Sequence, residues 1–304
     1  MKKIASVDIG TNSVLYSLFE ASGASKLRDV YFERHSPRIG SKLKGAKRQA
    51  ISKESYAHLL KIMRRIVSHA EKNSADAILV AATNPLRIAA NGKDVKENLE
   101  WDLGIPVEIL TSEREADLSF LGAVGPLKKD KEAMIIDLGG GSTEFVIYRG
   151  ARRRVFESLP EGAVSLTEVF DSAGKIDASR FGDYLKYLDR YTKTAKSIAK
   201  KVRCPITLVG GTSSTLGWLL DKEIMSKPRG VALSRKNLAL LVDILGGLNL
   251  SCRRELLAID KKRAEIIFAG AFWLLYLFNT MEIGKAQASP RGLRHGLALD
   301  FLLS

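Results

Sequence analysis

The chain has 304 residues, of which 45% are hydrophobic, and this is enough apolar material for about two domains with sizeable cores. It carries 48 Lys and Arg against 34 Asp and Glu, and the formal net charge of +14 favours an anionic partner: nucleic acid, a membrane surface or a polyphosphate-like substrate. Two cysteines far apart and four histidines form no paired metal-ligand motif.

Unpaired cysteines fit a reducing compartment, so we expect a cytoplasmic protein. The short apolar stretch at the N-terminus is not typical of a signal peptide. The longest apolar run, residues 266–278, is too short to span a bilayer and predicts a buried helix. We therefore expect no membrane attachment.

Apolar stretches and turn residues alternate along the first half of the chain. A helix is expected over residues 53–72 with Ser52 as its N-cap, and a second helix after residue 110 with Ser112 as its N-cap. The expected strands are residues 4–7, 14–19, 77–81 and 107–110.

Residues 125–130 combine turn residues with a lack of apolar periodicity, and we place a domain boundary there, after residue 126. The pattern then restarts, with a long helix expected over residues 178–201 and a mostly helical C-terminal third. Strands are expected at residues 133–137, 143–148, 155–159 and 206–209. Strands that alternate with helices predict an α/β fold with mixed sheets.

Two short motifs recur at a constant spacing of 129 positions. Residues 7–13 and 136–142 both contain Asp-x-Gly-x-x-Ser, which pairs Asp8 with Asp137 and Ser13 with Ser142. Residues 79–83 and 208–212 form a second pair at the same spacing. A repeated strand-and-loop pattern in one register predicts a duplicated fold with one phosphate loop in each half.

The repeated loops have the chemistry of a phosphate site. Glycines let the backbone turn sharply so that successive N–H groups point at one phosphate, and an aspartate at a strand end can hold a hydrated divalent cation there. A pair of ordinary glycine-rich hairpin turns is the alternative, and the duplication favours phosphate binding. Glu144, at the start of the strand after the second loop, can point back toward Asp137.

Two further segments are ambiguous from composition alone. Residues 111–117 hold three carboxylates at a helix start, where acids are common for capping reasons, but one of them could be a general base that activates water against phosphorus. In residues 83–87, Thr83 and Asn84 either cap a helix or bind phosphate, and Arg87 either neutralises charge or lies on the surface.

Two basic clusters stand out. The first is a loop before the helix at 53–72, and it can form a solvated face or steer a long anion. The second, at a predicted hairpin turn, contains Arg149, Arg152, Arg153 and Arg154. Neither is interleaved with aromatic residues, so we expect no nucleic-acid partner. The residues predicted to steer a polyanion are Arg38, Lys42, Lys44, Lys47 and Arg48.

The ordered set of motifs resembles the Ppx/GppA phosphatases, which comprise exopolyphosphatases and guanosine pentaphosphate phosphohydrolases of the actin-like (ribonuclease-H-like) ATPase superfamily. The resemblance rests on eight blocks in family order: residues 7–13, 82–87, 112–116, 136–144, 161–166, 210–212, 262–265 and 289–296. It implies two duplicated actin-like domains with mixed sheets and an interdomain cleft, in the short two-domain form. Because the last helix of this fold usually returns to the first domain, the implied domains are residues 1–126 with about 288–304, and residues 127–287.

The resemblance also implies roles for individual residues. Glu115 would be the base that activates water, and Arg87 would contact phosphate. Asp137 and Glu144, with Asp8, would bind Mg²⁺, or Mn²⁺ in its place, and a need for K⁺ is left open. The implied phosphate-binding residues are Asn12, Ser13, Thr83, Gly139, Gly140, Gly141, Ser142, Thr143, Gly211 and Thr212. Homodimers are common in the family.

The expected activity is release of orthophosphate from the ends of inorganic polyphosphate by in-line attack of water. Guanosine pentaphosphate hydrolysis, a sugar-kinase-like activity and a non-catalytic polyphosphate or alarmone sensor are the alternatives. Three residues depart from the family pattern: Arg114 adds positive charge beside Glu115, His295 replaces a usual glutamate, and Glu265 replaces a usual aspartate.

Overall fold

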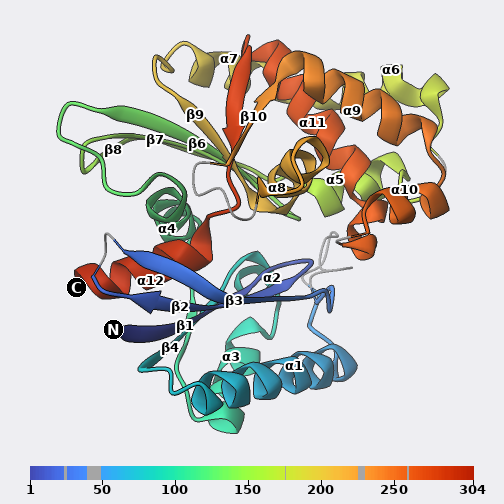
Figure 1. Cartoon of the computed structure of the whole chain (residues 1–304). Helices are drawn as coiled ribbons and strands as arrows, with labels where there is room; N and C mark the ends of the chain where they lie inside the picture. The colour runs from blue at the N-terminus through green and yellow to red at the C-terminus, as the bar shows by residue number, and fades with distance from the viewer. Residues whose placement is uncertain (24–25, 40–48, 175, 225–229, 259) are drawn as a thin grey trace. The chain divides into compact units, whose positions relative to one another are not determined.

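The computed structural model describes residues 1–23, 26–39, 49–174, 176–224, 230–258 and 260–304 (Figure 1). The chain divides into two compact units, Met1–Gly125 with Gly292–Ser304 (unit 1) and Pro126–Arg291 (unit 2). Four of the predicted steering residues lie outside the described residues: Lys42, Lys44, Lys47 and Arg48. Among the described helices, none is long and apolar enough to cross a membrane.

Unit 1 is a five-stranded mixed sheet in the order β3-β2-β1-β4-β5. Its strands are β1 (Lys2–Ile9), β2 (Val14–Ala21), β3 (Leu27–His35), β4 (Ala77–Ala82) and β5 (Val107–Ile109). The helices are α1 (Lys53–Lys72), α2 (Asn84–Ile88), α3 (Gly92–Leu103), α4 (Ser112–Val124) and α12 (Leu293–Leu303). Helices α4 and α12 cover one face of the sheet and α1 and α3 cover the other (Figure 1).

The sequence of β1 explains why both faces are covered. Ile4 packs with Phe19 and Ala298 on the α12 side, whereas Ala5 and Val7 belong to the core under α1. Successive strand residues point to opposite faces, so a run of apolar residues is expected where both faces are buried.

Unit 2 is a six-stranded mixed sheet in the order β10-β11-β9-β6-β7-β8. Its strands are β6 (Glu132–Leu138), β7 (Thr143–Arg149), β8 (Arg152–Leu159), β9 (Ile206–Val209), β10 (Val231–Ser234) and β11 (Lys285–Ala288). Its α-helices are α5 (Ala163–Phe170), α6 (Phe181–Leu188), α7 (Thr192–Ala199), α8 (Gly210–Leu220), α9 (Arg235–Gly247), α10 (Leu250–Leu256) and α11 (Ile267–Thr280). The predicted buried helix is α11, which is buried on nearly all sides.

The two sheets repeat one plan. In both units the first strand pairs antiparallel with the second and parallel with the fourth, giving the matching orders β3-β2-β1-β4 and β8-β7-β6-β9. The predicted duplication of an α/β fold with mixed sheets is therefore confirmed. The first segment of unit 1 ends at Gly125, one residue before the expected limit at 126. Its second segment starts at Gly292, four residues after the expected start at 288, so β11 belongs to unit 2.

Two expected helices differ from the structure. Thr111, not Ser112, is the N-cap of α4, because Thr111 has extended backbone angles and its hydroxyl accepts from Arg114 N at 3.1 Å, whereas Ser112 is already helical. The long helix predicted over 178–201 is broken into 3₁₀ turns and the separate helices α6 and α7. At the break, the Tyr276 hydroxyl bonds both Asp189 and Thr192, a tertiary contact that local periodicity does not reveal.

A fully buried arginine fixes one loop of unit 2. The Arg253 side chain is 0% exposed, and its guanidinium donates to the carbonyl oxygens of Ser172, Ala173, Gly174 and Ala264. Burial lowers the pKa of Arg253. We expect Arg253→Ala to lower the free energy of unfolding by about 2–4 kcal/mol, since it leaves carbonyls unpaired and a void. Chemical denaturation measures this loss.

Arg254 provides the matched control for this prediction. Its side chain is 49% exposed and pairs with Glu265 at 3.1 Å. Exposed ion pairs contribute little, so Arg254→Ala should cost no more than about 1 kcal/mol. Equal losses in the two variants would contradict the role of Arg253.

Helix α12 carries a buried polar network against β2 and β3. His295 Nε2 lies 2.8 Å from Asp29 Oδ2, and the neighbouring Arg294 bonds Ser17 and stacks over Phe32 at 4.6 Å. Burial alone raises the pKa of the Asp29 carboxyl, but the hydrogen bond and charge of His295, with the charge of Arg294, outweigh burial and lower it. The departure at His295 thus has a partner in Asp29.

The lowered pKa of Asp29 predicts an acid-dependent loss of stability. The folded state binds the proton more weakly than the unfolded state, so the stabilisation is complete above the unfolded pKa and is lost as the pH falls through the folded pKa. In Asp29→Asn, the drop in Tm relative to wild type should be largest near neutral pH and shrink below about pH 4. A difference in Tm that stays constant with pH would contradict this prediction.

Candidate active site

The glycine loop of unit 2, residues 139–142, joins β6 to β7. Gly139 N donates to Ser142 O at 3.0 Å, which closes the turn. The Gly139 carbonyl accepts from Ala163 N at 3.0 Å, and the Gly140 carbonyl accepts from Val164 N at 2.8 Å. The first turn of α5 therefore holds the carbonyl side of the loop.

The N–H side of the same loop meets no protein acceptor in the part of the chain that the structure describes. Among the described residues, the N–H groups of Gly140, Gly141 and Ser142 donate to no other group. Successive N–H groups on one side of a turn form a concavity that binds anions. The predicted phosphate loop thus has the required backbone arrangement.

Close packing against α5 fixes this arrangement. A Cβ atom built on Gly162 would lie 2.5 Å from the carbonyl carbon of Gly140 and 2.7 Å from Gly139 O. Only glycine allows the helix start to approach the loop this closely.

The Thr143 side chain points into the core of unit 2. Its hydroxyl is buried, donates to Glu161 O at 2.6 Å and accepts from Trp273 Nε1 at 3.0 Å. The hydroxyl therefore anchors the loop to the core of unit 2 and does not face the phosphate side. Only the backbone of Thr143 remains a predicted phosphate contact.

Glu161 is a buried carboxylate that sequence reasoning did not single out. Its Oε1 accepts from Tyr187 and Tyr191 at 2.7 and 2.9 Å, and its Oε2 accepts from Ser165 at 3.1 Å. Burial, together with the bond to Glu161, raises the pKa of Tyr187 to about 12, so this phenol remains a donor. Glu161 and Trp273 hold the end of the loop through their bonds with Thr143. The one signal for them in the sequence is that Glu161 begins one of the family blocks.

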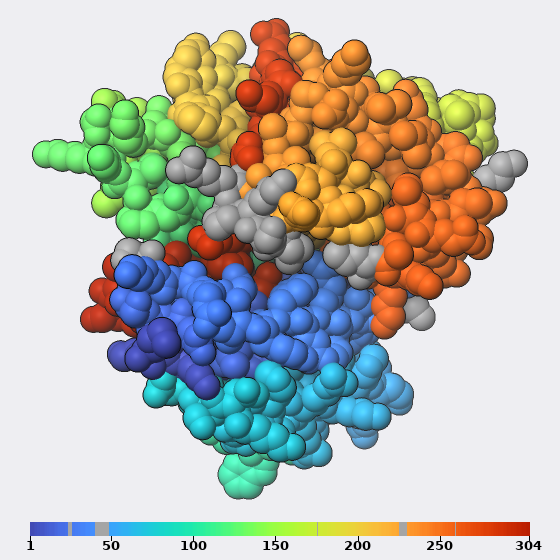
Figure 2. Space-filling model, in the orientation of Figure 1, coloured from blue at the N-terminus to red at the C-terminus, as the bar shows by residue number. Residues whose placement is uncertain are grey.

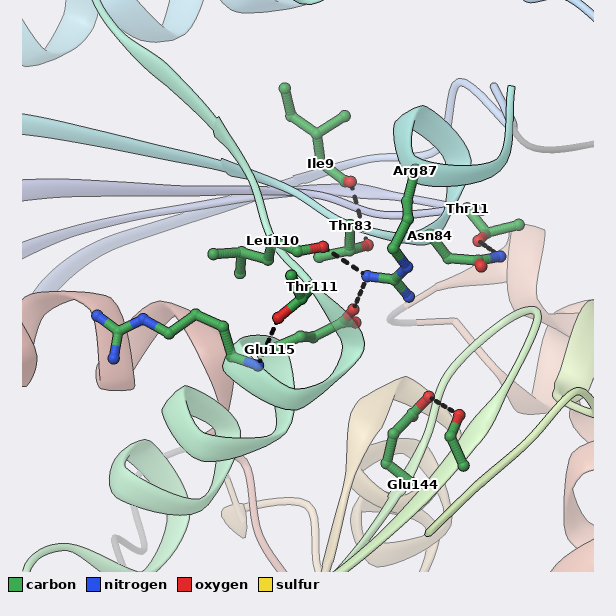
Figure 3. A network of polar contacts seen from close by, with 11 residues as sticks. Ile9, Thr11, Thr83, Asn84, Arg87, Leu110, Thr111, Glu115 and Glu144 are labelled. Carbon is green, nitrogen blue, oxygen red and sulfur yellow. Dashed lines mark hydrogen bonds and ion pairs between the residues drawn. The ribbon is translucent and has the colours of Figure 1, made fainter. Parts of the chain in front are cut away.

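Asp137 and Glu144 are direct cross-strand partners in the β6–β7 pair. Directly opposed residues place their side chains on one face of a sheet, as the sequence predicted. Glu144 is 3% exposed and its Oε1 accepts from Ser158 Oγ at 3.0 Å (Figure 3). Within the described residues there is no group of three or more His, Cys, Asp and Glu able to hold a metal, but Mg²⁺ needs only one or two carboxylates, with water and phosphate oxygens.

The second predicted element of unit 2 is the turn from β9 into α8. Gly210 has a φ of +90°, which favours glycine, and a Cβ on it would lie 2.3 Å from Leu138 O. The Thr212 hydroxyl is buried against Gly270 of α11, and the phosphate contact of Thr212 stays a prediction. The Arg263 guanidinium packs directly on Gly211.

The loop of unit 1 repeats the turn of the glycine loop. Gly10 N donates to Ser13 O at 2.9 Å, matching Gly139 and Ser142. Asn12 and Ser13 are each 9% exposed and bond one another at 3.2 Å. Asp8 is the second-last residue of β1, just as Asp137 is the second-last residue of β6.

Thr83 lies behind the loop of unit 1, not on its surface. Its side chain is 4% exposed, and its hydroxyl donates to Ile9 O at 3.3 Å (Figure 3). In this structure the Thr83 hydroxyl thus ties β4 to β1, and its phosphate contact stays a prediction. Asn84 Nδ2 reaches Thr11 Oγ1 at 3.5 Å.

The structure brings the two predicted catalytic residues together in unit 1. Arg87 Nη1 donates to Glu115 Oε2 at 2.9 Å and to Leu110 O at 2.8 Å (Figure 3). The two side chains are 21% and 18% exposed, so both remain accessible to solvent. Arg87 lies on α2 and Glu115 on the first turn of α4. The Leu110 carbonyl also accepts from the Arg87 guanidinium and so holds it beside Glu115.

The residues that depart from the family pattern have partners elsewhere. Arg114 bonds Asp300 of α12, so its charge is paired with a carboxylate of that helix. Glu265 pairs with Arg254 at 3.1 Å.

Comparison with known proteins agrees with this geometry. The model of the Ppx/GppA phosphatase family matches residues 18–304. The chain belongs to the Ppx/GppA phosphatase family.

Relatives in this family cover the whole chain. A Ppx/GppA family member from Aquifex aeolicus is 25% identical, with a TM-score of 0.79 over 99% of this chain and 98% of that one. An exopolyphosphatase from Cytophaga hutchinsonii shares the fold, with a TM-score of 0.87 at 18% identity over 99% and 98% of the two chains. The chain thus shares the fold of a solved member of the Ppx/GppA family.

A curated relative from Aeromonas salmonicida, a guanosine-5'-triphosphate,3'-diphosphate pyrophosphatase, is 26% identical over 98% of this chain. The Ppx/GppA chain described here spans only 59% of the length of that relative.

Proposed function

We propose that this phosphatase is an exopolyphosphatase that releases orthophosphate from the ends of inorganic polyphosphate. The observation that carries the proposal is the glycine loop, whose carbonyls are held by α5 while the N–H groups of Gly140, Gly141 and Ser142 lack a protein acceptor among the described residues. A terminal phosphoryl group supplies the oxygens that such a loop binds. The net charge of +14 supports a long polyanion as substrate.

In this proposal Glu115 accepts the proton of the attacking water and Arg87 orients the Glu115 carboxylate. The bond from Arg87 Nη1 to Glu115 Oε2 supports that assignment. Water attacks phosphorus in line with the departing polyphosphate oxygen, so the P–O bond to the chain breaks as the new one forms. The protein contributes positioning and neutralisation of charge, and no covalent intermediate is required.

Asp137 and Glu144 are the residues that would hold Mg²⁺. The register of the β6–β7 pair supports this, because it places both carboxylates on one face beside the glycine loop. The cation would neutralise charge on the phosphate oxygens. Asp8 is the equivalent residue in unit 1.

Guanosine pentaphosphate hydrolysis is the second candidate activity. It is favoured by the name of the relative from Aeromonas salmonicida, although that relative extends well beyond the segment it shares with this chain. Both activities use one phosphate loop and one base, so the same variants test both.

Orthophosphate release tests the proposal directly. Purified protein with Mg²⁺ is incubated separately with long polyphosphate, guanosine pentaphosphate and ATP. Release from polyphosphate supports the exopolyphosphatase, and preference for guanosine pentaphosphate moves the assignment to the second candidate. Binding of polyphosphate without release from any substrate would instead identify a sensor.

A further inference from the structure

Helix α7 and the residues after it form a strongly basic stretch of unit 2. Residues 192–203 contain five cations and no Asp or Glu. We define the α7 basic surface as the exposed cations that line two hollows on either side of this helix: Arg154, Lys193, Lys196, Lys200, Lys201, Arg203 and Lys285.

The first hollow lies between β8 and α7 and has a volume of about 560 Å³. It is lined by Arg154, Lys193 and Lys201, with the hydroxyl group of Ser197 among them and Glu157 as its carboxylate. Three cations against one carboxylate make this hollow attractive to anions.

The second hollow lies on the other side of α7, toward β11, and has a volume of about 620 Å³. It is lined by Lys196, Lys200, Arg203 and Lys285, with Glu282 as its carboxylate. Figure 2 shows α7 in yellow between the green β7–β8 hairpin and the red β11, so the two hollows flank one helix.

These cations do not serve as ion-pair partners within the described part of unit 2. Within the described residues, no carboxylate lies within 4 Å of any cation of the α7 basic surface. The pairs Lys193–Lys196 and Lys196–Lys200 place like charges three and four residues apart, which destabilises a helix. The helix dipole favours Lys196 and Lys200 near the C-terminus of α7 but disfavours Lys193 in its first turn.

This surface is separate from the glycine loop. Ile206 and Lys285, the first residues of β9 and β11, line the second hollow. The glycine loop follows Leu138, the last residue of β6, and β6 runs parallel to β9. The hollow and the loop therefore lie at opposite ends of the sheet.

We propose that the α7 basic surface is a second binding site for long linear polyphosphate, which rests on the proposed function of the glycine loop. Lysine ammonium groups are compact point charges suited to successive phosphates. Binding of single-stranded nucleic acid would require exposed aromatic rings on which bases stack. The one aromatic residue among the linings of the two hollows is Phe156, and Arg153 covers its ring at 5.5 Å.

A second site changes how substrates of different length are used. A long chain contacts the α7 basic surface while its end is hydrolysed, whereas tripolyphosphate reaches only the glycine loop. The surface therefore lowers KM for long chains and leaves kcat unchanged.

Charge-neutralising variants test the proposal. The first variant combines Arg154→Gln, Lys193→Gln and Lys201→Gln, and the second combines Lys196→Gln, Lys200→Gln and Arg203→Gln. A control variant removes three exposed charges elsewhere, through Lys61→Gln, Lys186→Gln and Lys236→Gln. Binding of labelled long polyphosphate is measured by fluorescence anisotropy over a range of salt concentrations, beside steady-state kinetics with long polyphosphate and with tripolyphosphate.

We expect either surface variant to weaken long-chain binding roughly tenfold and to reduce the slope of log K against log salt by about two. Its KM for long chains should rise, with kcat and tripolyphosphate hydrolysis unchanged, and the control variant should match wild type. Unchanged long-chain binding in both surface variants, or an equal loss in the control, would overturn the proposal. Tighter binding of single-stranded RNA than of polyphosphate would also overturn it.

The binding measurement separates this proposal from the proposed function. If wild type binds long polyphosphate through the α7 basic surface but releases no orthophosphate, the second binding site is supported and the exopolyphosphatase assignment is wrong. If wild type hydrolyses polyphosphate and the surface variants keep the KM of wild type, the second site alone fails.

Discussion

Replacing Glu115 with glutamine is expected to lower the rate of orthophosphate release by about a hundredfold or more, equivalent to about 2.7 kcal/mol of activation free energy. The amide cannot accept a proton from the attacking water. It retains a side-chain oxygen that can accept from Arg87 Nη1, so the contact at 2.9 Å and the fold should survive. Single-turnover hydrolysis of polyphosphate or guanosine pentaphosphate measures the chemical step.

Glu113 provides the matched control for Glu115→Gln. It is an exposed carboxylate in the same first turn of α4, so Glu113→Gln removes the same charge from the same helix end. We expect Glu113→Gln to retain near-normal turnover, and Glu115→Gln to keep substrate binding. Near-normal turnover in Glu115→Gln would remove Glu115 from the role of base.

The second large effect is expected at Gly162, where alanine should reduce kcat/KM by roughly a hundredfold, since a displacement of about 1 Å at a site can have that consequence. The added Cβ would lie 2.5 Å from Gly140 C and 2.7 Å from Gly139 O. Both are backbone atoms of the glycine loop, so the loop or the start of α5 must shift. The backbone of Gly162 is extended at φ −145°, which alanine adopts freely, so the effect is steric.

Stability should fall in Gly162→Ala by about 1–3 kcal/mol, as in other overpacked sites. Gly182 provides the control, because it lies exposed on α6 with nothing within 4 Å of its added Cβ. Alanine there should raise stability by up to about 1 kcal/mol and leave hydrolysis unchanged. Full activity in a folded Gly162→Ala protein would contradict the role of the loop in binding phosphate.

The sequence predicted the repeated parts of the fold well. The duplicated loops appear with the same closing bond, from Gly10 to Ser13 in unit 1 and from Gly139 to Ser142 in unit 2. The helix capped by Ser52 was predicted correctly from one capping residue and a periodic apolar face. The segment predicted as one helix over 178–201 is helical from residue 178 to 199, but a 3₁₀ turn divides it into α6 and α7. At that turn the Tyr276 hydroxyl bonds Asp189 and Thr192, a tertiary contact absent from the local pattern.

In the candidate site, too, local spacing predicted some features and tertiary packing decided others. The in-register pairing of Asp137 with Glu144 follows from two strands joined by a short loop, so sequence spacing was sufficient. Thr83, Thr143 and Thr212 were named as phosphate-binding residues from their place in the motifs, and all three side chains are buried. Spacing places a residue on a strand or turn, but the packing of distant segments decides whether its side chain faces solvent or core.

The amino-acid sequence by itself determined the duplicated architecture, the two glycine-containing loops and the excess of positive charge, because turns, caps and strand periodicity depend on neighbouring residues. Only the tertiary structure decided what holds the site in place. Trp273 reaches Thr143 across 130 positions, and Arg114 reaches Asp300 across 186. Such contacts depend on which helices pack against each sheet. The packing of helices on a sheet is the one that buries the most apolar surface of the whole unit, and a local sequence pattern does not encode it.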